Sequence, residues 1–175
     1  MTMPAFTFSS ARSPVDIVDA TALFRAYAAS LDVDLAYQGF EAEMAAMPGR
    51  YAPPAGELLL ARGIGGEALG AVGLRAIEPA GCCEMKRLYV APAARGLGVG
   101  AALVDAIAKA AARIGYDELR LDTLPTMTGA IALYLRLGFE EIAPYYDTPV
   151  AGTVFLRKRL RPNPSNLDRS PSHRP

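Results

Sequence analysis

The sequence lacks most of the residues that nucleophilic catalysis and metal binding need. It has one histidine, His173, and two adjacent cysteines, Cys82 and Cys83. A Ser-His-Asp or Cys-His mechanism needs a histidine in the folded body, whereas His173 is in the last residues of the chain. Neighbouring cysteines on a strand point to opposite faces, so they fit neither a disulfide nor a shared metal. We therefore expect no zinc site; a lone cysteine nucleophile stays open.

An excess of charge and long apolar runs are also absent. The chain carries 18 basic and 18 acidic side chains, for a formal net charge of zero. A balanced chain does not carry the basic surface typical of a nucleic-acid-binding domain. No apolar run reaches the roughly 20 residues that span a bilayer, and the first residues do not follow the pattern of a signal peptide. We expect a cytoplasmic protein that binds neither nucleic acid nor membrane.

Length and composition indicate one globular domain. The chain has 175 residues, of which 51% are hydrophobic and 21% charged, which is enough apolar material for a core. We expect a single domain over residues 1–160. Residues 161–175 are rich in Pro, Ser, Asn and Arg and are expected to form a disordered tail.

Hydrophobic periodicity predicts a mixed α/β domain. Residues 13–30 form a helix that starts with Ser13 as N-cap and Pro14 in the first turn. The Gly-rich turn at 63–67 predicts a β-hairpin. The order is strand, helices, three meandering strands, helix, strand, helix and two strands. The expected segments after the first helix are strands at 57–62, 67–77, 82–90, 116–124, 139–143 and 153–160, and helices at 98–114 and 126–137.

The stretch "RGLGVGA" places three glycines, spaced two apart, where a long helix starts. Glycine there costs stability relative to alanine, so a function is the better explanation. Helix N-termini carry free N–H groups that bind phosphate, and glycine lets the phosphate come close. Arg95, Gly96, Gly98 and Gly100 are therefore predicted to cradle a pyrophosphate. A tight connection between strand and helix is the alternative.

Two common phosphate-binding motifs fit this loop poorly. A kinase-type loop ends in Gly-Lys-Ser/Thr, whereas Ala101 follows Gly100 here. The dinucleotide pattern G-x-G-x-x-G/A fits Gly96, Gly98 and Ala101, with Asp122 near the end of the next strand. However, "APAA" separates the loop from its strand. The strand "EMKRLYV" is also too charged to be buried on both faces of a parallel sheet.

Two signatures together resemble the GNAT superfamily of N-acetyltransferases. "RGLGVGA" matches its acetyl-CoA loop (Arg or Gln, two residues, Gly, one residue, Gly or Ala), and "ALYLRLGF" at 132–139 resembles its second signature. "EMKRLYV", "LDTLPTM" and "PYYDTP" resemble a bacterial group whose acceptors are mostly unassigned. The resemblance covers about residues 5–160. It implies an α+β fold with a mixed, mostly antiparallel central sheet, helices on both faces and a splayed strand pair that binds acetyl-CoA.

The resemblance also implies which residues bind the cosubstrate acetyl-CoA. They are the backbone of Leu88 and Val90 along the pantetheine arm, and Arg95, Gly96, Gly98, Gly100 and Ala101 around the pyrophosphate. The second signature usually has an asparagine where this chain has Met127, so contacts from that helix are expected to differ, with backbone groups or Thr126 as substitutes. Arg136 is expected either at the CoA phosphates or on a solvated helix face.

Tyr134 matches the family tyrosine that protonates the departing CoA thiolate. A phenol with a pKa near 10 is able to donate this proton. The alternative is a core role, because Tyr134 shares a helix face with Ile131 and Leu135.

Glu84 lies eleven positions before Arg95, where some family members have a general base. An alkylammonium must lose a proton before it can attack, and a partly buried carboxylate can accept that proton. The alternative is an ion pair of Glu84 with Lys86 or Arg87.

The acceptor is expected to be a primary amine, either of a small molecule or of a protein, acetylated directly in a ternary complex. Three segments, 32–41, 47–54 and 144–149, are expected to bind it. They supply tyrosines and carboxylates that suit a cation, namely Tyr37, Tyr51, Tyr145, Tyr146, Asp32, Asp34 and Glu41. Ordinary loop packing is the alternative. A non-catalytic acyl-CoA sensor, an NAD-type dinucleotide-binding protein and a homodimer stay open.

Overall fold

The computed structural model describes residues 5–160. His173 and the expected tail lie outside this range. A seven-stranded sheet forms the centre, in the order β1-β2-β3-β4-β5-β7-β6, and only the β4–β5 pair is parallel. The strands are β1 (Phe6–Ser10), β2 (Glu57–Gly63), β3 (Ala68–Ile77), β4 (Cys82–Val90), β5 (Glu118–Thr123), β6 (Glu140–Ile142) and β7 (Val154–Arg159).

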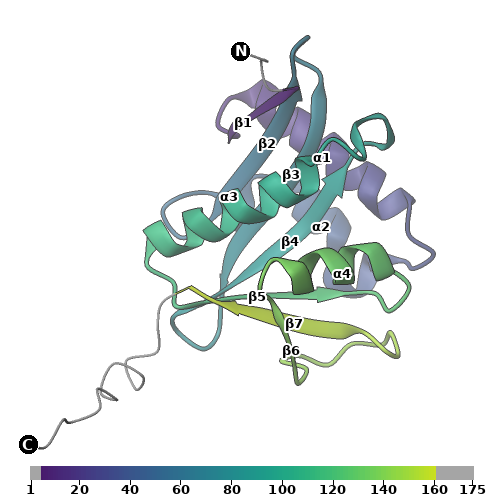
Figure 1. Ribbon diagram of the computed structural model, residues 1–175, viewed down its shortest axis with the longest axis vertical. Helices are drawn as coiled ribbons and strands as arrows, with labels where there is room; N and C mark the ends of the chain where they lie inside the picture. Colours follow the sequence, from purple (N-terminus) through teal and green to yellow (C-terminus); the bar gives the residue numbers. More distant parts are fainter. Residues whose placement is uncertain (1–4, 161–175) are drawn as a thin grey trace, which may run out of the picture.

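Helices cover both faces of this sheet. The α-helices are α1 (Pro14–Ala29), α2 (Phe40–Ala45), α3 (Val99–Ile114) and α4 (Thr128–Arg136). Short 3-10 helices are η1 (Leu35–Gln38), η2 (Gly49–Tyr51) and η3 (Pro92–Ala94). In Figure 1, α3 crosses the front of the sheet and α1 and α2 lie behind it. The predicted mixed, mostly antiparallel fold is confirmed, although α4 is shorter than expected because Met127 has a non-helical φ of −83° and ψ of 59°.

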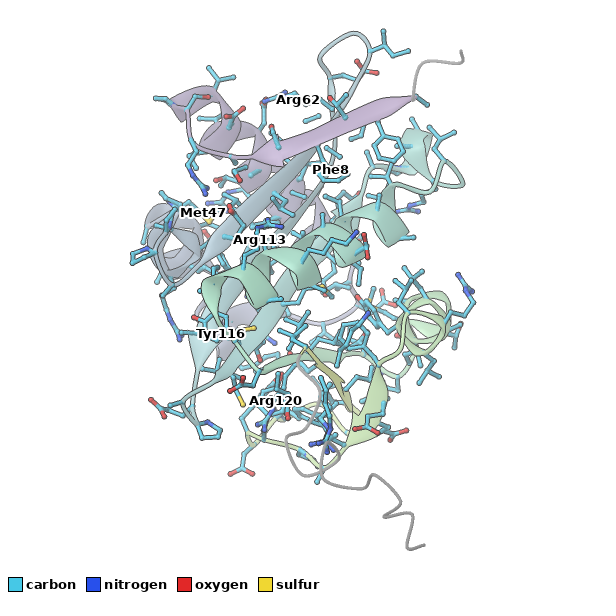
Figure 2. The ribbon with its side chains drawn as sticks, turned by 60° about the vertical axis from the view of Figure 1, so that its left-hand side comes forward. Phe8, Met47, Arg62, Arg113, Tyr116 and Arg120 are labelled. Atoms are coloured by element: carbon cyan, nitrogen blue, oxygen red, sulfur yellow. The ribbon has the colours of Figure 1, made fainter. Side chains whose placement is uncertain are left out.

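Helix α1 starts as the sequence predicts. Ser13 and Asp16 form a reciprocal capping box, and Pro14 is in the first turn. Arg62 of β2, labelled in Figure 2, places Nη2 at 2.9 Å from Asp16 and 2.8 Å from Asp19. The Arg62 guanidinium lowers the pKa of Asp16 to about 2. Capping and ion pairs thus hold α1 against the edge of the sheet.

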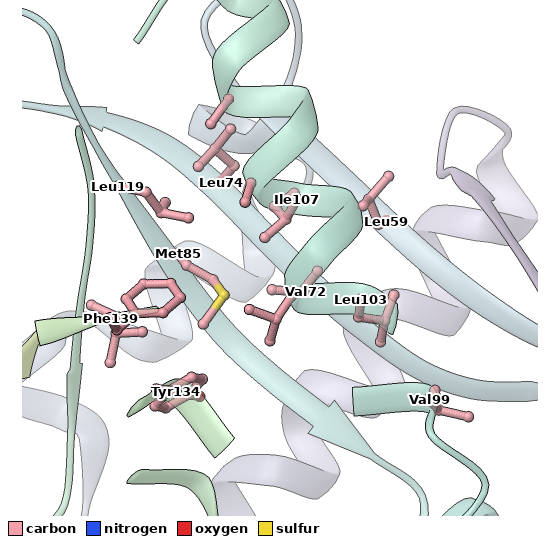
Figure 3. Close-up of a cluster of buried hydrophobic side chains, with 14 of the residues drawn as sticks. Leu59, Val72, Leu74, Met85, Val99, Leu103, Ile107, Leu119, Tyr134 and Phe139 are labelled. Atoms are coloured by element: carbon pink, nitrogen blue, oxygen red, sulfur yellow. The ribbon is translucent and has the colours of Figure 1, made fainter. Parts of the chain in front are cut away.

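The main core lies between α3 and the sheet. Leu103 and Ile107 of α3 are fully buried against Val72 and Leu74 of β3 and Leu119 of β5 (Figure 3). Because side chains alternate along a strand, the residues between these apolar ones point to the other face. On β4 and β5 those residues are charged, which creates a polar strip on the face away from α3.

Strands β4 and β5 separate after a short pairing. Only three residue pairs join them, and the last is Glu84 with Arg120. A one-residue shift in the β3–β4 register falls at Arg87, whose φ is +62°. Such a bulge bends its strand and interrupts the ladder. The expected splayed strand pair is confirmed, and the gap beyond Glu84 positions the site.

The two cysteines begin β4. Both are free and buried, and burial raises the pKa of Cys82 and Cys83. A thiol whose pKa is raised is a poor nucleophile at neutral pH. Neither thiol lines the cavities described next.

Candidate functional site

A cavity of about 750 Å³ lies at the end of β4, beside the start of α3 and one face of α4. We call it the glycine-loop cavity. Its size is in the range of small-molecule binding sites. Its lining includes all the residues predicted to bind the cosubstrate, namely Leu88, Val90, Arg95, Gly96, Gly98, Gly100 and Ala101.

The glycine loop leaves the start of α3 free for an anion. Gly98 is the N-cap with φ +83°, and no side chain caps this end of the helix. Gly96 has φ +82°, a conformation that favours glycine, whereas Gly100 does not have a positive φ. A free helix N-terminus with Arg95 at the cavity wall suits a pyrophosphate.

Residues at the start of α4 and at its end also contribute to the glycine-loop cavity. Met127, Gly129 and Arg136 line the glycine-loop cavity, and Arg136 adds a second positive charge there. Thr126 lines a neighbouring cavity of about 250 Å³ instead, so the structure does not bring it to the glycine loop.

Tyr134 of α4 lies in the hydrophobic core, and it is not among the residues that line the glycine-loop cavity. It is 6% exposed, and its ring packs against Phe139 with centroids 5.7 Å apart (Figure 3). Within residues 5–160, no fully buried side-chain oxygen lacks a hydrogen-bond partner. The Tyr134 hydroxyl, which has no partner in that range, therefore keeps a small exposed surface. Burial is the main cause that raises the pKa of Tyr134, and the charges of Tyr27 and Asp122 raise it further. The phenol therefore stays protonated at neutral pH.

A second cavity of about 360 Å³, here named the outer pocket, contains Glu84. The side chains around it are Tyr37, Gln38, Arg75, Ile77, Glu78, Glu84, Lys86, Tyr145, Tyr146 and Asp147. Glu84 is 2% exposed, and both of its oxygens are engaged. Arg75 donates to Oε1 from Nε at 3.0 Å and Nη2 at 2.8 Å, and the Tyr145 hydroxyl donates to Oε2 at 2.6 Å.

The alternative of an ion pair between Glu84 and Lys86 or Arg87 is wrong. Arg75 lies directly opposite Glu84 in the β3–β4 register, which makes the two side chains cross-strand neighbours. Arg87 instead contacts Glu43 at 3.0 Å.

Lys86 and Asp122 form a second arrangement of the same kind. Lys86 Nζ lies 3.3 Å from Asp122 Oδ1, and the Tyr146 hydroxyl donates to Oδ2 at 2.8 Å. The rings of Tyr145 and Tyr146 both pack edge-on against Phe155 of β7, at 5.1 and 5.2 Å between centroids. Each carboxylate thus lies between a cation and a tyrosine hydroxyl.

A small central cavity of about 30 Å³ lies between the other two. It shares Tyr27 with the glycine-loop cavity, and Tyr37, Gln38 and Lys86 with the outer pocket. Asp122 lines this central cavity. Its volume is close to that of one water molecule in the liquid. The glycine-loop cavity and the outer pocket therefore approach each other through one narrow, polar space.

The expected acceptor residues divide into two groups. Tyr37, Tyr145 and Tyr146 line the outer pocket. Tyr51 is 1% exposed in the core and donates to Glu43. The remaining expected residues also lie elsewhere: Asp34 caps η1, Glu41 pairs with Arg25, and Asp32 lines the 250 Å³ cavity.

Sequence reasoning missed three charged residues of the site, Arg75, Lys86 and Asp122. The signal was the alternation of charged with apolar residues along β4 and β5, which marks a polar face on strands that are otherwise buried. Within residues 5–160, no three His, Cys, Asp or Glu side chains are grouped so as to hold a metal ion. None of the helices in that range is long and apolar enough to cross a membrane.

Known proteins resemble this chain along most of its length. Residues 22–139 match the model of the acetyltransferase (GNAT) family. An uncharacterized N-acetyltransferase of Schizosaccharomyces pombe is 39% identical over 154 residues, which cover 88% of this chain and 94% of that relative.

Solved structures agree on the fold. An acetyltransferase of the GNAT family from Staphylococcus aureus superposes with a TM-score of 0.75 at 18% identity, over 90% of this chain and all of that one. A protein from Salmonella typhimurium, solved with its cofactor acetyl-CoA, superposes with a TM-score of 0.66 at 18% identity, over 91% of this chain and 96% of the other. The chain belongs to the GNAT family of acetyltransferases, and acetyl-CoA is its cosubstrate.

Proposed function

We propose that this enzyme transfers the acetyl group of acetyl-CoA directly to a primary amine while both substrates are bound. The arrangement of the cavities carries this proposal. The glycine-loop cavity and the outer pocket share no lining residue, and each shares lining residues with the central cavity. Two molecules therefore have room to bind at once, one on each side of the central cavity. The cysteines lie outside these cavities, which argues against an acetylated thiol on the enzyme.

For the cosubstrate side, we propose that the N–H groups of Gly96, Gly98, Gly100 and Ala101 hold the pyrophosphate, with Arg95 beside it. The free N-terminus of α3 and the cavity around it support this assignment. Leu88 and Val90 then offer strand backbone to the pantetheine arm. When bound, acetyl-CoA supplies the thioester that the amine attacks.

We propose Tyr134 as the acid that protonates the leaving sulfur. Two neighbours on the same helix, Ala130 and Leu133, line the glycine-loop cavity, which supports this role. The raised pKa supports it too, since a phenol that remains protonated in the resting enzyme has a proton to give. The thiolate is stabilised as that proton arrives.

We propose that Glu84 accepts the first proton of the acceptor ammonium through Tyr145. The Glu84 side chain is only 3% exposed, and Tyr145 lies at its Oε2, so we propose that the ammonium reaches Glu84 through Tyr145. Tyr145 donates its own proton to Glu84 and leaves its oxygen lone pairs free to accept. When the ammonium gives a proton to the Tyr145 oxygen, the hydroxyl proton of Tyr145 moves to Glu84.

The acceptor side favours an amine that is cationic in solution. Tyrosine rings attract an ammonium group, and the pocket holds Tyr37, Tyr145 and Tyr146. Both a small amine and a lysine side chain of a protein suit a pocket of about 360 Å³. Free buried cysteines suit a reducing compartment, which supports a cytoplasmic location.

The proposal is tested by ligand-induced stabilisation and thiol release. Acetyl-CoA and CoA at a hundred times their Kd should add about 2.7 kcal/mol of stability, on the order of 5 °C in Tm, and NAD should add nothing. Purified enzyme with acetyl-CoA should then release free thiol with at least one of ethylamine, spermidine, lysine or a lysine-containing peptide. Tight CoA binding without thiol release would favour a binding module, and stabilisation by NAD alone a dinucleotide-binding protein.

A further inference from the structure

Asp122 lines the central cavity, which shares residues with both larger cavities. It follows Arg120, the last residue of β5 that pairs with β4, by two positions on the same face of the strand. It lines the central cavity, whereas Glu84 lines only the outer pocket. Its side chain is 9% exposed. Of these two carboxylates, Asp122 is therefore the one placed at the junction with the glycine-loop cavity.

Polar groups from several elements surround Asp122. Lys86 of β4 and Tyr146 of the β6–β7 loop bond its two oxygens. Its charge also acts on Tyr27 of α1 and Tyr134 of α4. The remaining polar side chains around the central cavity are Tyr37, Gln38, Arg87 and Thr123.

Acetylation of an ammonium requires its nitrogen to lose two protons. One must leave before attack, since a protonated nitrogen has no lone pair. The second must leave after the N–C bond has formed, because the amide product carries one hydrogen fewer than the attacking amine. The proposed route through Glu84 and Tyr145 accounts for the first proton alone, since it lies in the outer pocket.

We infer that Asp122 is a second catalytic carboxylate, which accepts the proton that the nitrogen loses after it attacks the thioester. This inference rests on the proposed function. In the step, the N–C bond forms and the C–S bond breaks. The nitrogen proton passes to Asp122, and the sulfur takes the proton of Tyr134. Loss of the proton from Asp122 to solvent and uptake of one by Tyr134 from solvent restore both groups.

The coupling between Asp122 and Tyr134 makes these transfers cooperative. While Asp122 is ionised, its negative charge helps to keep the proton on Tyr134. Once Asp122 has accepted a proton, that charge is gone and Tyr134 becomes the stronger acid. The phenol thus gives up its proton when the sulfur needs it.

A binding experiment tests the position of Asp122 without turnover. The probe is coenzyme A, whose thiol lacks the electron-withdrawing backbone groups of cysteine and therefore has a pKa above the cysteine value of about 8.5, with desulfo-coenzyme A as reference. A carboxylate beside the sulfur disfavours thiolate, so wild-type affinity for coenzyme A, measured by calorimetry relative to desulfo-coenzyme A, should fall as the pH rises through the pKa of the free thiol. In Asp122→Asn this fall should be clearly smaller. An unchanged pH dependence in this variant overturns the inference.

The matched control is Glu118→Gln, on the same strand. Glu118 bonds Arg120 at 2.6 Å and lies outside the three cavities, so its variant should follow the wild-type pH dependence. Asp122→Asn leaves the buried Lys86 without its anion and risks misfolding. The double variant Lys86→Gln with Asp122→Asn removes both charges together, and the same weakened pH dependence is expected from it.

A kinetic experiment separates the two protons. Ethylamine is an ammonium ion at pH 7, whereas methoxyamine has the same size and is neutral. Glu84→Gln should slow thiol release with ethylamine alone, and Asp122→Asn should slow it about a hundredfold with both amines. If Asp122→Asn slows only ethylamine, Asp122 takes the first proton and the inference is wrong. A wild-type enzyme silent with every amine contradicts the proposed function, while coenzyme A binding still decides where Asp122 lies.

Discussion

Glu84 and Asp122 are each held by one cation and one tyrosine hydroxyl. Arg75 and Tyr145 hold the first, and Lys86 and Tyr146 hold the second. Because each tyrosine donates to its carboxylate, its oxygen is left to accept from a ligand. Tyr145 and Tyr146 are consecutive residues of the β6–β7 loop, and each supplies the hydroxyl that binds one of the two carboxylates.

Loss of the Tyr134 hydroxyl should separate binding from chemistry. Tyr134→Phe keeps the ring against Phe139, so the affinity for acetyl-CoA and the Tm should change little. The value of kcat should fall about a hundredfold or more, since the sulfur then leaves unprotonated. Calorimetry and thiol release measure the two quantities. Tyr116→Phe, whose hydroxyl bonds Ala55 O at 2.7 Å and lies away from the cavities, is the control. Full turnover by Tyr134→Phe would remove the tyrosine from the mechanism.

Loss of the Tyr145 hydroxyl should affect the acceptor amine only. Tyr145→Phe retains the packing against Phe155 but deprives Glu84 Oε2 of its donor and interrupts the proposed proton path. With ethylamine, kcat/KM at pH 7 should fall about tenfold or more, and with methoxyamine it should stay near the wild-type value. Steady-state kinetics with both amines at fixed acetyl-CoA measures this. An equal loss with both amines would place the tyrosine outside the path of the first proton.

The cosubstrate side of the site is easier to predict from the sequence than the acceptor side. The residues at the glycine loop follow one another within a short stretch, so a local pattern is enough to find them. The acceptor side is assembled from distant segments, since Lys86 and Asp122 are 36 positions apart and Tyr145 is 61 positions from Glu84. Their contacts depend on strand register and on where β4 and β5 separate, which no local pattern contains.

Two glycines at the start of helix α3, Gly98 and Gly100, differ in whether the backbone conformation requires glycine. Gly98 has φ +83°, whereas a Cβ on Gly100 would meet Val90 and Leu133 at ordinary distances of 3.6 and 3.8 Å. The strand–helix order that surrounds them was predictable because the periodic segments are long. The η helices were not predictable, since a few residues carry no clear period.

Alanine at these two glycines should have opposite effects. Gly98→Ala forces a non-glycine residue into the left-handed region and should cost about 1–2 kcal/mol, with weaker binding of acetyl-CoA. Gly100→Ala should be neutral or stabilise by up to about 1 kcal/mol, because alanine favours the helix, and the family pattern accepts alanine there. Denaturant unfolding and calorimetry measure both effects. Equal stability losses at the two positions would contradict the role of φ at Gly98.

The start of α1 should stabilise the protein in a pH-dependent way. The pKa of Asp16 is lowered to about 2 in the folded chain, chiefly by Arg62, from 3.8. A lowered pKa means that the contribution is complete above pH 4 and is lost as the pH falls through about 2. The Tm of Asp16→Asn should therefore be lower than that of the wild type at pH 7, and the gap should close between pH 4 and 2. A constant gap would show that Asp16 acts without its charge.

The whole molecule consists of two sheet segments joined by few strand contacts. Strands β1–β4 form one segment and β5, β7 and β6 the other, and three residue pairs of β4 and β5 connect them. The core under α3 adds Leu119 and Tyr134 to the connection. A ligand in the glycine-loop cavity touches β4, α3 and α4, so it joins the two segments further.

Bound acetyl-CoA should therefore protect one part of the molecule more than the rest. At a hundred times its Kd it should slow amide hydrogen exchange about a hundredfold in the end of β4, the first turn of α3 and α4, because 2.7 kcal/mol corresponds to that factor. Exchange in β1 and the first half of β2 should change much less. Hydrogen-exchange mass spectrometry compares these segments. Uniform protection of all strands would indicate global stabilisation without bridging.

The central cavity has a consequence for how such enzymes diversify. The two larger cavities share no lining residue, and one space of about 30 Å³ lies between them. Substitutions in the outer pocket therefore leave the cosubstrate contacts intact. New acceptors are accessible by changes at Tyr37, Ile77 or Asp147 without loss of acetyl-CoA binding. Selection is then free to act on the acceptor alone, and one donor chemistry is kept while its targets change.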